Sequence, residues 1–328
     1  MTAISYHRTV NDLQGQAWIA GNPFTRADWF GLIESSMARP LFAVAADADT
    51  AIALPLADTG RMLRPLSNWY AFTWSPMVTA GTADDALLVK LARGLAARSP
   101  AITLDKLPDE DGTATRLENA FRAAGWLVRR DICDTNHVLP VAGRSYAQFL
   151  ADRPGPLRTT LKRKAKKVAV ELFTRFDADA WAEYEAVYRE SWKPEEGDPV
   201  LLRRFAMAEG DAGRIRFALA RHDGAVIAAQ FWTVEASTAY IHKLAHRESA
   251  KPLSAGTTVT AALFAHVIDS DRVDLVDFGT GDDPYKRDWM EQVRPRYRLT
   301  MWRRENPLNW PAIAKAYLRQ LVSASPAG

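Results

Sequence analysis

The stretch VDLVDFGTGDDPYKRDW, residues 273–289, decides the fold of this sequence. Its first six residues alternate apolar and acidic side chains and stop at a glycine, which predicts a buried strand over 273–278. Two glycines then break the strand, and Pro284 suits the first position of a short helix with one of the two preceding aspartates as N-cap. A strand end, a glycine turn and a helix start therefore meet where backbone N–H groups can hold a ligand.

Lys286 is the unusual residue of this stretch, because a cation in the first turn of a helix opposes the helix dipole. We expect it to have an anionic partner, either Asp277, Asp282 or a bound ligand. The alternative interpretation is a capped helix in which an Asp–Lys pair is purely structural.

Two further features accompany this stretch. A basic lead-in, SYAQFL followed by LRTTLKRKAKKV, precedes a helix with Tyr188 and Trp192, and the hairpin IRFALARHDGAVIAAQFWTVEASTAYIHKLAH leads to PLSAGTTVTAALFAHVI. With these features, the segment from Tyr146 to about Trp302 resembles the acetyltransferase-like domain of the GNAT superfamily in cellulose-biosynthesis-associated and FemAB-like proteins. The resemblance covers about half of the chain. It implies tandem GNAT-like domains, of which the second keeps the ligand-binding features.

The expected elements follow from periodicity and turn residues. In the first half the sequence predicts helices at 29–37, 86–95 and 114–123, and strands at 41–46, 51–57, 101–104, 126–132 and 136–139. In the second half it predicts helices at 178–192, 200–210 and 256–268, and strands at 215–220, 226–234, 239–245, 273–278 and 296–303. The fold class is mixed α/β, with two domains that each carry a mixed, mostly antiparallel sheet flanked by helices. We expect a degenerate GNAT-like domain at 1–143, an acyltransferase domain at 144–305 and an amphipathic helix at 306–328.

Composition sets the bounds on function. The chain has 328 residues, enough for two domains with separate cores, and its formal charge of +3 permits an anionic partner without requiring one. Cys133 is the only cysteine, which excludes an internal disulfide and a thiolate metal cluster, and we predict no metal site. The chain shows neither a signal-peptide pattern nor a run of about 18 apolar residues, so we expect a cytoplasmic protein, with a peripheral position at the inner membrane as the alternative.

Two predicted helices have a clear amphipathic pattern. In the first, Leu157, Leu161, Ala165 and Val168 form an apolar stripe, and most of the remaining surface is lysine and arginine. The basic surface is either a solvated face or a contact for anionic lipid headgroups or RNA phosphates. In the C-terminal helix the apolar face that includes Trp310 is expected to pack on the body, with a membrane-surface anchor as the alternative.

The resemblance implies where a thioester donor binds. In a GNAT domain the fourth and fifth strands splay apart, and the helix after the fourth strand presents its N-terminus to the pyrophosphate of the donor. The usual phosphate loop, Q/R-x-x-G-x-G/A, is replaced here by HRESAKPLSAGTT. The predicted donor-binding residues are Arg247, Ser254, Gly256, Thr257 and Lys286.

Acyl transfer to an amine needs a base, an oxyanion donor and an acid for the departing thiolate. We predict His242 as the base with Asp277 as its partner, and Tyr285 as the acid, although a strand histidine can also be a core residue. Lys243, which faces away from His242, is predicted to be a surface residue. A loop with exposed aromatics beside an amide, formed by Asn68, Trp69 and Tyr70, is a candidate for acceptor contacts.

The predicted function is therefore an N-acyltransferase with no permanent cofactor, which uses acyl-CoA, or an acyl carrier protein, as co-substrate. The preferred acceptor is a lipid-like amine, such as a long-chain sphingoid base that gives a ceramide-type amide, met at the anionic inner membrane surface. One alternative is FemABX-like transfer of an amino acid from aminoacyl-tRNA to a cell-wall precursor, the only interpretation with a nucleic-acid partner. Another is a non-catalytic GNAT-fold module in polysaccharide or envelope assembly.

Overall fold

The computed structural model describes residues 3–36, 39–79 and 84–324. The chain divides into two units, the first made of residues 1–134 with 295–328 and the second of residues 135–294. These limits differ from the expected 1–143, 144–305 and 306–328, because the strands β7 (Leu127–Pro140) and β13 (Gln292–Trp302) each continue from one unit into the other. Residue 37, at the end of the predicted helix 29–37, and residues 325–328 lie outside the described residues.

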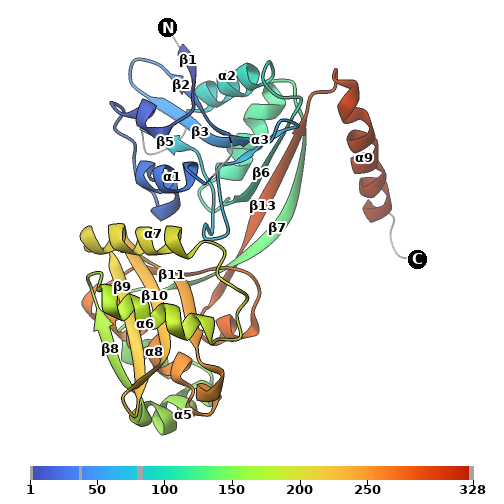
Figure 1. The fold of residues 1–328 in the computed structure, drawn as a ribbon. Coiled ribbons are helices and arrows are strands. Elements are labelled where there is room, and N and C mark those ends of the chain that lie inside the picture. Colours follow the sequence, from blue (N-terminus) through green and yellow to red (C-terminus); the bar gives the residue numbers. More distant parts are fainter. Residues whose placement is uncertain (1–2, 37–38, 80–83, 325–328) are drawn as a thin grey trace. The chain divides into compact units, whose positions relative to one another are not determined.

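Unit 1 is a mixed sheet with helices (Figure 1). Its strands run in the order β1-β2-β3-β4-β6-β13, with β5 paired to β3. Their bounds are β1 Ala3–His7, β2 Pro40–Ala46, β3 Ala51–Asp58, β4 Leu63–Pro65, β5 Met77–Val78 and β6 Ala101–Leu107. The helices are α1 Ala27–Glu34, α2 Asp85–Leu95, α3 Thr113–Ala123 and α9 Trp310–Ala324. Leucines on the inner faces of α2 and α3 are buried against this sheet, so the amphipathic spacing read from the sequence is what holds unit 1 together.

Unit 2 carries its own sheet, in the order β7-β12-β11-β10-β9-β8. The strands are β8 Ala169–Phe173, β9 Ile215–His222, β10 Ala225–Glu235, β11 Thr238–His246 and β12 Leu275–Thr280. The helices are α4 Tyr146–Ala151, α5 Gly155–Lys164, α6 Ala178–Arg189, α7 Pro199–Asp211 and α8 Ala255–Ala265. β8 to β11 form antiparallel pairs, whereas β11 and β12 are parallel because α8 connects them.

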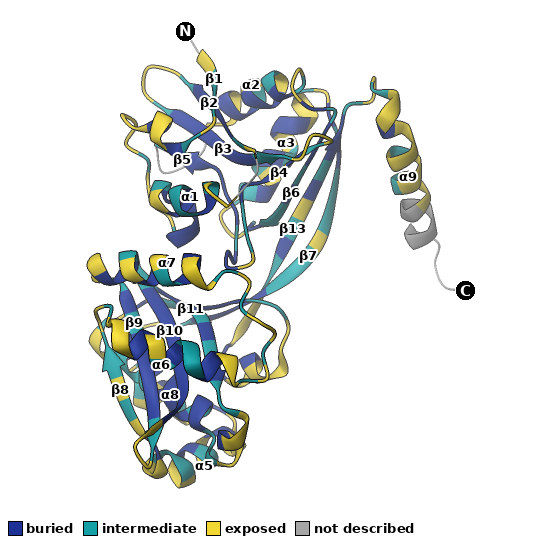
Figure 2. Cartoon of the chain, viewed as in Figure 1, coloured by how far each residue is buried: buried dark blue, intermediate teal, exposed yellow. Residues whose placement is uncertain are grey.

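Helices cover both faces of the unit 2 sheet. On β10, Phe231 packs edge-on against Trp181 of α6, while its neighbour Trp232 packs edge-on against Phe264 of α8. Because successive residues of a strand point to opposite faces, α6 lies on one face and α8 on the other. Figure 2 shows the strands between them as mostly buried.

The parallel pair β11 and β12 separates soon after it forms. Their register runs only from Thr238 opposite Leu275 to Tyr240 opposite Asp277, although β11 continues to residue 246. β12 ends in the glycine turn, where Gly279 (φ 69°) and Gly281 (φ 92°) take left-handed conformations that favour glycine. The two strands therefore open a gap at the start of α8, as the GNAT resemblance implies.

The structure confirms the predicted mixed α/β fold class and refines its elements. Strands expected at 126–132 and 136–139 are one continuous strand, β7. The strand expected at 273–278 runs over 275–280, and the helix after it is a 3-10 helix, η6, at Pro284–Asp288. Among the residues described, no helix has both the length and the hydropathy needed to cross a bilayer.

The C-terminal helix α9 differs from its prediction. Trp310 and Tyr317, expected on a packed face, are 59% and 50% exposed, and Leu318 is 63% exposed. The indole of Trp310 donates a hydrogen bond to the carbonyl of Arg304 but leaves most of its surface in solvent. The apolar stripe of this helix is thus largely uncovered within unit 1.

Candidate active site

A cavity of about 350 Å³ opens at the N-terminal end of α8. It is lined by Leu157, Trp192, Leu244, His246, Ala250, Lys251, Ser254, Ala255, Gly256, Thr257, Thr260, Tyr285, Asp288 and Trp289. Three predicted donor-binding residues, Ser254, Gly256 and Thr257, and the predicted acid Tyr285 are therefore brought together here. We call this the α8 cavity.

The start of α8 is shaped for a close ligand. Ser254 is the N-cap residue but has φ 51°, and its side chain makes no capping bond. Its hydroxyl instead accepts a hydrogen bond of 3.0 Å from Lys164 of α5. A Cβ built on Gly256 would lie 3.3 Å from the ring of His246, so the helix approaches β11 closely because this residue is glycine. The first-turn N–H groups and the helix dipole favour an anion at this end.

The segment before α8 forms a different structure in the place of the usual GNAT phosphate loop. Glu248–Leu253 forms a 3-10 helix, η4, and its backbone N–H groups bond internally, as in Ala250 to the carbonyl of Arg247 and Ser254 to that of Lys251. Pro252 has no N–H at all. The first turn of α8 is thus the part of this segment best suited to bind an anion through its backbone.

Aromatic and apolar side chains form the remaining walls. The indole of Trp192 lies 4.2 Å, centroid to centroid, from the ring of His246, and Trp192 is 48% exposed. Trp289 stacks on Phe264 at 4.9 Å and 3°. Such walls suit an apolar arm or acyl chain.

Tyr285 connects this cavity to the glycine turn. Its ring packs edge-on against Phe278 at 5.5 Å. Burial, together with the carboxylate of Asp283, raises the pKa of Tyr285 to about 12. The phenol therefore stays protonated at neutral pH and keeps a proton available for a leaving group at the cavity.

Lys286 is buried, with 4% of its surface exposed, and is held by the glycine turn. Its ammonium donates to the carbonyls of Thr280, Gly281 (3.2 Å) and Gly279 (3.5 Å). These three acceptors are backbone carbonyls of the glycine turn, and the anionic partner that the sequence predicts for Lys286 stays a prediction. Lys286 is also not among the residues that line the α8 cavity, so in the described structure it supports the turn.

His137 of β7 lies beside this turn and is 1% exposed. Its Nε2 is 3.2 Å from Oδ1 of Asp282. Burial, and then the ammonium of Lys286, lower the pKa of His137, so the ring is neutral near pH 7. The predicted base partner Asp277 accepts hydrogen bonds from the amide of Asn136 (2.6 Å) and the N–H of Gly279 (2.7 Å).

His242 is the extra residue of a β-bulge, since Trp232 pairs with Ile241 and Phe231 with Lys243. Its Nε2 is 2.8 Å from the hydroxyl of Thr233, and its ring stacks on Phe231 at 4.9 Å. His242 does not line the α8 cavity in the described structure, and its role as base remains a prediction.

A second cavity, of about 600 Å³, lies along α6 and the segment that leads to α7. It is lined by Trp181, Tyr184, Glu185, Tyr188, Arg189, Lys193, Pro194, Glu195, Glu196, Pro199, Val200, Leu202 and Arg203. We call this the α6 cavity. Trp192 lines one cavity and Lys193 the other, so the segment after α6 separates the two.

Charged groups gather at the α6 cavity. Lys243 of β11 is 7% exposed and its ammonium is 2.9 Å from Glu196, which corrects the prediction that Lys243 is a surface residue. Burial, and then the carboxylate of Glu196, raise the pKa of Tyr188 to about 12. Burial and the Lys243 ammonium lower the pKa of Lys193 to about 8. A lysine with such a pKa is partly neutral near pH 7 and can accept a proton.

The sequence reasoning missed Lys193, Glu196 and His137. Nothing in the local pattern marks the first two, because KPEEGD reads as an exposed loop. A signal for Lys243 was present: it lies within an otherwise apolar strand, where a charge is buried only with a partner.

The other predicted residues lie elsewhere. Arg247 donates to the carbonyl of Val226 (2.9 Å) and to Glu190 (2.7 Å), and it is not among the residues that line the α8 cavity in the described structure. In unit 1, Trp69 is 76% exposed, whereas Tyr70 is only 7% exposed and so is a core residue, not a surface contact.

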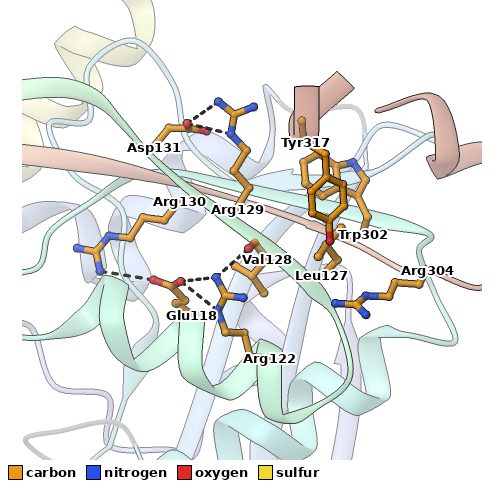
Figure 3. A pocket seen from close by; sticks show the side chains of 11 residues that line it. Glu118, Arg122, Leu127, Val128, Arg129, Arg130, Asp131, Trp302, Arg304 and Tyr317 are labelled. Atoms are coloured by element: carbon orange, nitrogen blue, oxygen red, sulfur yellow. Dashed lines mark hydrogen bonds and ion pairs between the residues drawn. The ribbon is translucent and has the colours of Figure 1, made fainter. Parts of the chain in front are cut away.

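Unit 1 has a cavity of its own, of about 600 Å³, shown in Figure 3. Its walls carry four arginines, with Trp302 and Tyr317 beside them. Arg122 pairs with Glu118 at 2.7 Å and Arg129 with Asp131 at 2.7 Å, so much of this positive charge is compensated internally. Since the residues predicted as base, base partner and acid all lie in unit 2, we place the candidate active site there.

Comparison with known proteins identifies a family domain within unit 2. Residues 156–287 match the family model of the acetyltransferase (GNAT) domain. No curated protein sequence matches the chain.

Three solved structures share the fold at low sequence identity. The crystal structure of FemX has a TM-score of 0.64 and 9% identity, covering 95% of this chain and 99% of FemX. L-PGS from Bacillus licheniformis has a TM-score of 0.58 and 13% identity, covering 87% and 89%. A tandem GNAT protein from the clavulanic acid biosynthesis pathway has a TM-score of 0.51 and 16% identity, covering 93% and 100%. The GNAT and FemAB-like resemblance and the tandem GNAT-like fold are thereby confirmed, with the GNAT domain itself matched over residues 156–287.

Proposed function

We propose that unit 2 is an N-acyltransferase that binds an acyl thioester in the α8 cavity and an amine acceptor in the α6 cavity. The observation that carries the proposal is the α8 cavity itself. It joins a helix N-terminus suited to a phosphate, an apolar wall suited to a pantetheine arm or acyl chain, and the protonated phenol of Tyr285.

The chemistry needs one nucleophilic attack and three proton movements. The base removes a proton from the acceptor ammonium, and the free amine attacks the thioester carbonyl. A C–N bond forms as the C–S bond breaks, Tyr285 gives its proton to the departing thiolate, and the second proton that the nitrogen loses restores the phenol. The bulge on β11 at His242 interrupts regular strand pairing, and we propose a backbone N–H at this point as the oxyanion donor.

Two residues are candidates for the base. His242 is the residue predicted from the sequence, and its ring stacks on Phe231, which faces α6. Asp277 points to this same face of the sheet, because its neighbours Val276 and Phe278 are in the core on the α8 side. Lys193 lines the α6 cavity and has a pKa of about 8. A His242→Gln variant and a Lys193→Met variant distinguish them, because loss of the base removes the acidic limb of the pH profile of kcat/KM as well as the rate.

We propose a lipid-like amine as the acceptor. The α6 cavity offers three aromatic rings for an apolar chain, and the carboxylate of Glu196 near its polar end suits an ammonium group. A long-chain sphingoid base, which would give a ceramide-type amide, combines these two properties. Contact with the inner membrane surface then follows from the solubility of the acceptor and is part of the proposal.

The test is direct. Purified protein is incubated with short-chain and long-chain acyl-CoA and with a long-chain amine, and amide formation is measured by mass spectrometry. Thermal stabilisation by each thioester gives an independent measure of donor binding. Amide formation lost in Tyr285→Phe supports the proposal. Absence of both stabilisation and amide with every thioester contradicts it.

A second candidate is transfer of an aminoacyl group from tRNA. It is favoured by the fold likeness to FemX and L-PGS, which extends over most of each chain. Binding of uncharged tRNA with a steep salt dependence, without stabilisation by any thioester, would support this function instead. Absence of binding to either donor would favour a non-catalytic module in envelope assembly.

A further inference from the structure

The segment from Gly155 to Val168, which covers α5 and the 3-10 turn after it, is strongly basic. It contains six cations and no acid. The cations are Arg158, Lys162, Arg163, Lys164, Lys166 and Lys167. Five of them are exposed, Lys164 is half-buried, and none of the six forms an ion pair in the part of the chain that the structure describes. We call this surface the α5 face.

The α5 face adjoins the α8 cavity. Leu157, on the inner side of α5, lines the cavity. The ammonium of Lys164 lies 3.0 Å from the hydroxyl of Ser254, which lines it too. A partner bound to the exposed cations therefore lies next to the mouth of the cavity.

We propose that the α5 face is a docking surface for an acidic carrier protein, which presents the acyl group on a phosphopantetheine arm to the α8 cavity. This inference rests on the proposed function, since it names the carrier of the donor. The phosphodiester at the base of the arm would lie at the first turn of α8 beside Lys164, and the thioester would reach Tyr285.

The backbone before α8 favours one phosphate over the several phosphates of a nucleotide donor. The N–H groups of Ala250 and Ser254 are used inside that turn, and Pro252 has none, so a single phosphate is best placed at the first turn of α8. The exposed cations meanwhile are spread from Arg158 to Lys167. Ten helical residues span about 15 Å. The exposed positions of Lys162 and Arg163 on this helix therefore indicate a partner larger than a nucleotide.

The surroundings favour a protein over RNA or a membrane. Asp288 lines the cavity and is exposed, so a continuous phosphate backbone would meet repulsion there, whereas the charge of Glu248 is paired with Lys251 at 2.6 Å. A helix that lies in a lipid surface inserts apolar side chains next to its cations. Among the described residues of 155–168, no large apolar side chain is exposed. An acidic protein can bind the α5 face through complementary charges alone.

The experiment compares two donors with the same acyl chain, one on CoA and one on an acidic acyl carrier protein. The test variant is Lys162→Glu/Lys166→Glu, which reverses two exposed charges outside the cavity. The control is Arg175→Glu/Arg204→Glu, which reverses two exposed charges after β8 and on α7. We expect the test variant to lower kcat/KM for the acyl carrier protein about tenfold or more, mainly through KM, and to leave kcat/KM for acyl-CoA unchanged. The control should change neither.

Binding of the carrier protein is measured separately, by titration of fluorescently labelled carrier at two salt concentrations. Binding that weakens with salt and is lost in the test variant supports the docking surface, even if no amide forms with either donor, in which case only the proposed function fails. Equal use of acyl-CoA and acyl carrier protein, both unaffected by the test variant, overturns the inference. So does binding of tRNA or of anionic vesicles, but not of the carrier, that the test variant abolishes.

Discussion

Replacement of Lys243 by methionine should destabilise unit 2 strongly, because it leaves the carboxylate of Glu196 buried. The two side chains are 8% and 11% exposed and lie 2.9 Å apart. Removal of one partner from such a pair costs about 3–5 kcal/mol. For a protein whose total stability is about 5–15 kcal/mol, this is a large fraction.

The paired substitution separates the charge effect from the loss of packing. In Lys243→Met/Glu196→Leu both charges are replaced by apolar groups of similar length. We expect its free energy of unfolding to lie within about 1 kcal/mol of the wild type, since a buried pair and an apolar replacement are often nearly equal in stability. Urea denaturation followed by circular dichroism at pH 7 measures all three proteins, and an unchanged slope with urea shows that the unfolding reaction is the same.

The same set of variants tests the site. If Glu196 contributes to acceptor binding, the double variant is folded but has a raised KM for the amine. A cost below about 1 kcal/mol in Lys243→Met would refute the reasoning, because that is the value of an exposed ion pair. It would mean that the pair is solvated and that Lys243 is a surface residue after all.

Three further predictions concern acid, base and acceptor. Tyr285→Phe should lower kcat about 10²-fold or more with little change in donor KM, because the phenol acts on the departing thiolate, and stopped-time assays with acyl thioester measure it. The pKa of Lys193 lies near 8 in the folded protein against 10.5 for a free lysine. The unfolded chain therefore binds more protons between these values, so stability should rise with pH over this window in the wild type and rise less in Lys193→Met, as measured by urea midpoints from pH 7 to 10. Trp69→Ala should change the melting temperature little, because Trp69 is 76% exposed, and a raised acceptor KM would confirm its predicted role.

The donor half of the site could be predicted because its signals are local. A glycine turn, a proline and a helix start are fixed by backbone conformation, and Gly281 indeed has φ 92°. Ser254, Gly256 and Thr257 follow in sequence from one helix terminus, so one correct helix boundary places all three at the α8 cavity.

The acceptor half could not be predicted in the same way, because its residues meet only through tertiary packing. Lys243 and Glu196 are 47 residues apart and come from a strand and a loop. His137 comes from β7, which was predicted as two short strands of the first domain. The sequence therefore did not indicate that His137 lies beside β12. Periodicity reports which face of an element is apolar, but it does not report which loop covers that face.

The segment after α6 connects the two halves of the proposed site. Trp192 stacks on His246 at the α8 cavity, and its neighbour Lys193 lines the α6 cavity. Three residues later, Glu196 holds Lys243 of β11, the strand whose separation from β12 opens the gap for a donor. A donor that packs against Trp192 therefore acts on the same short segment that carries the charges facing the acceptor. Binding of the two substrates should be coupled through this segment, since Trp192 in the wall of one cavity and Lys193 in the wall of the other are neighbours in the chain.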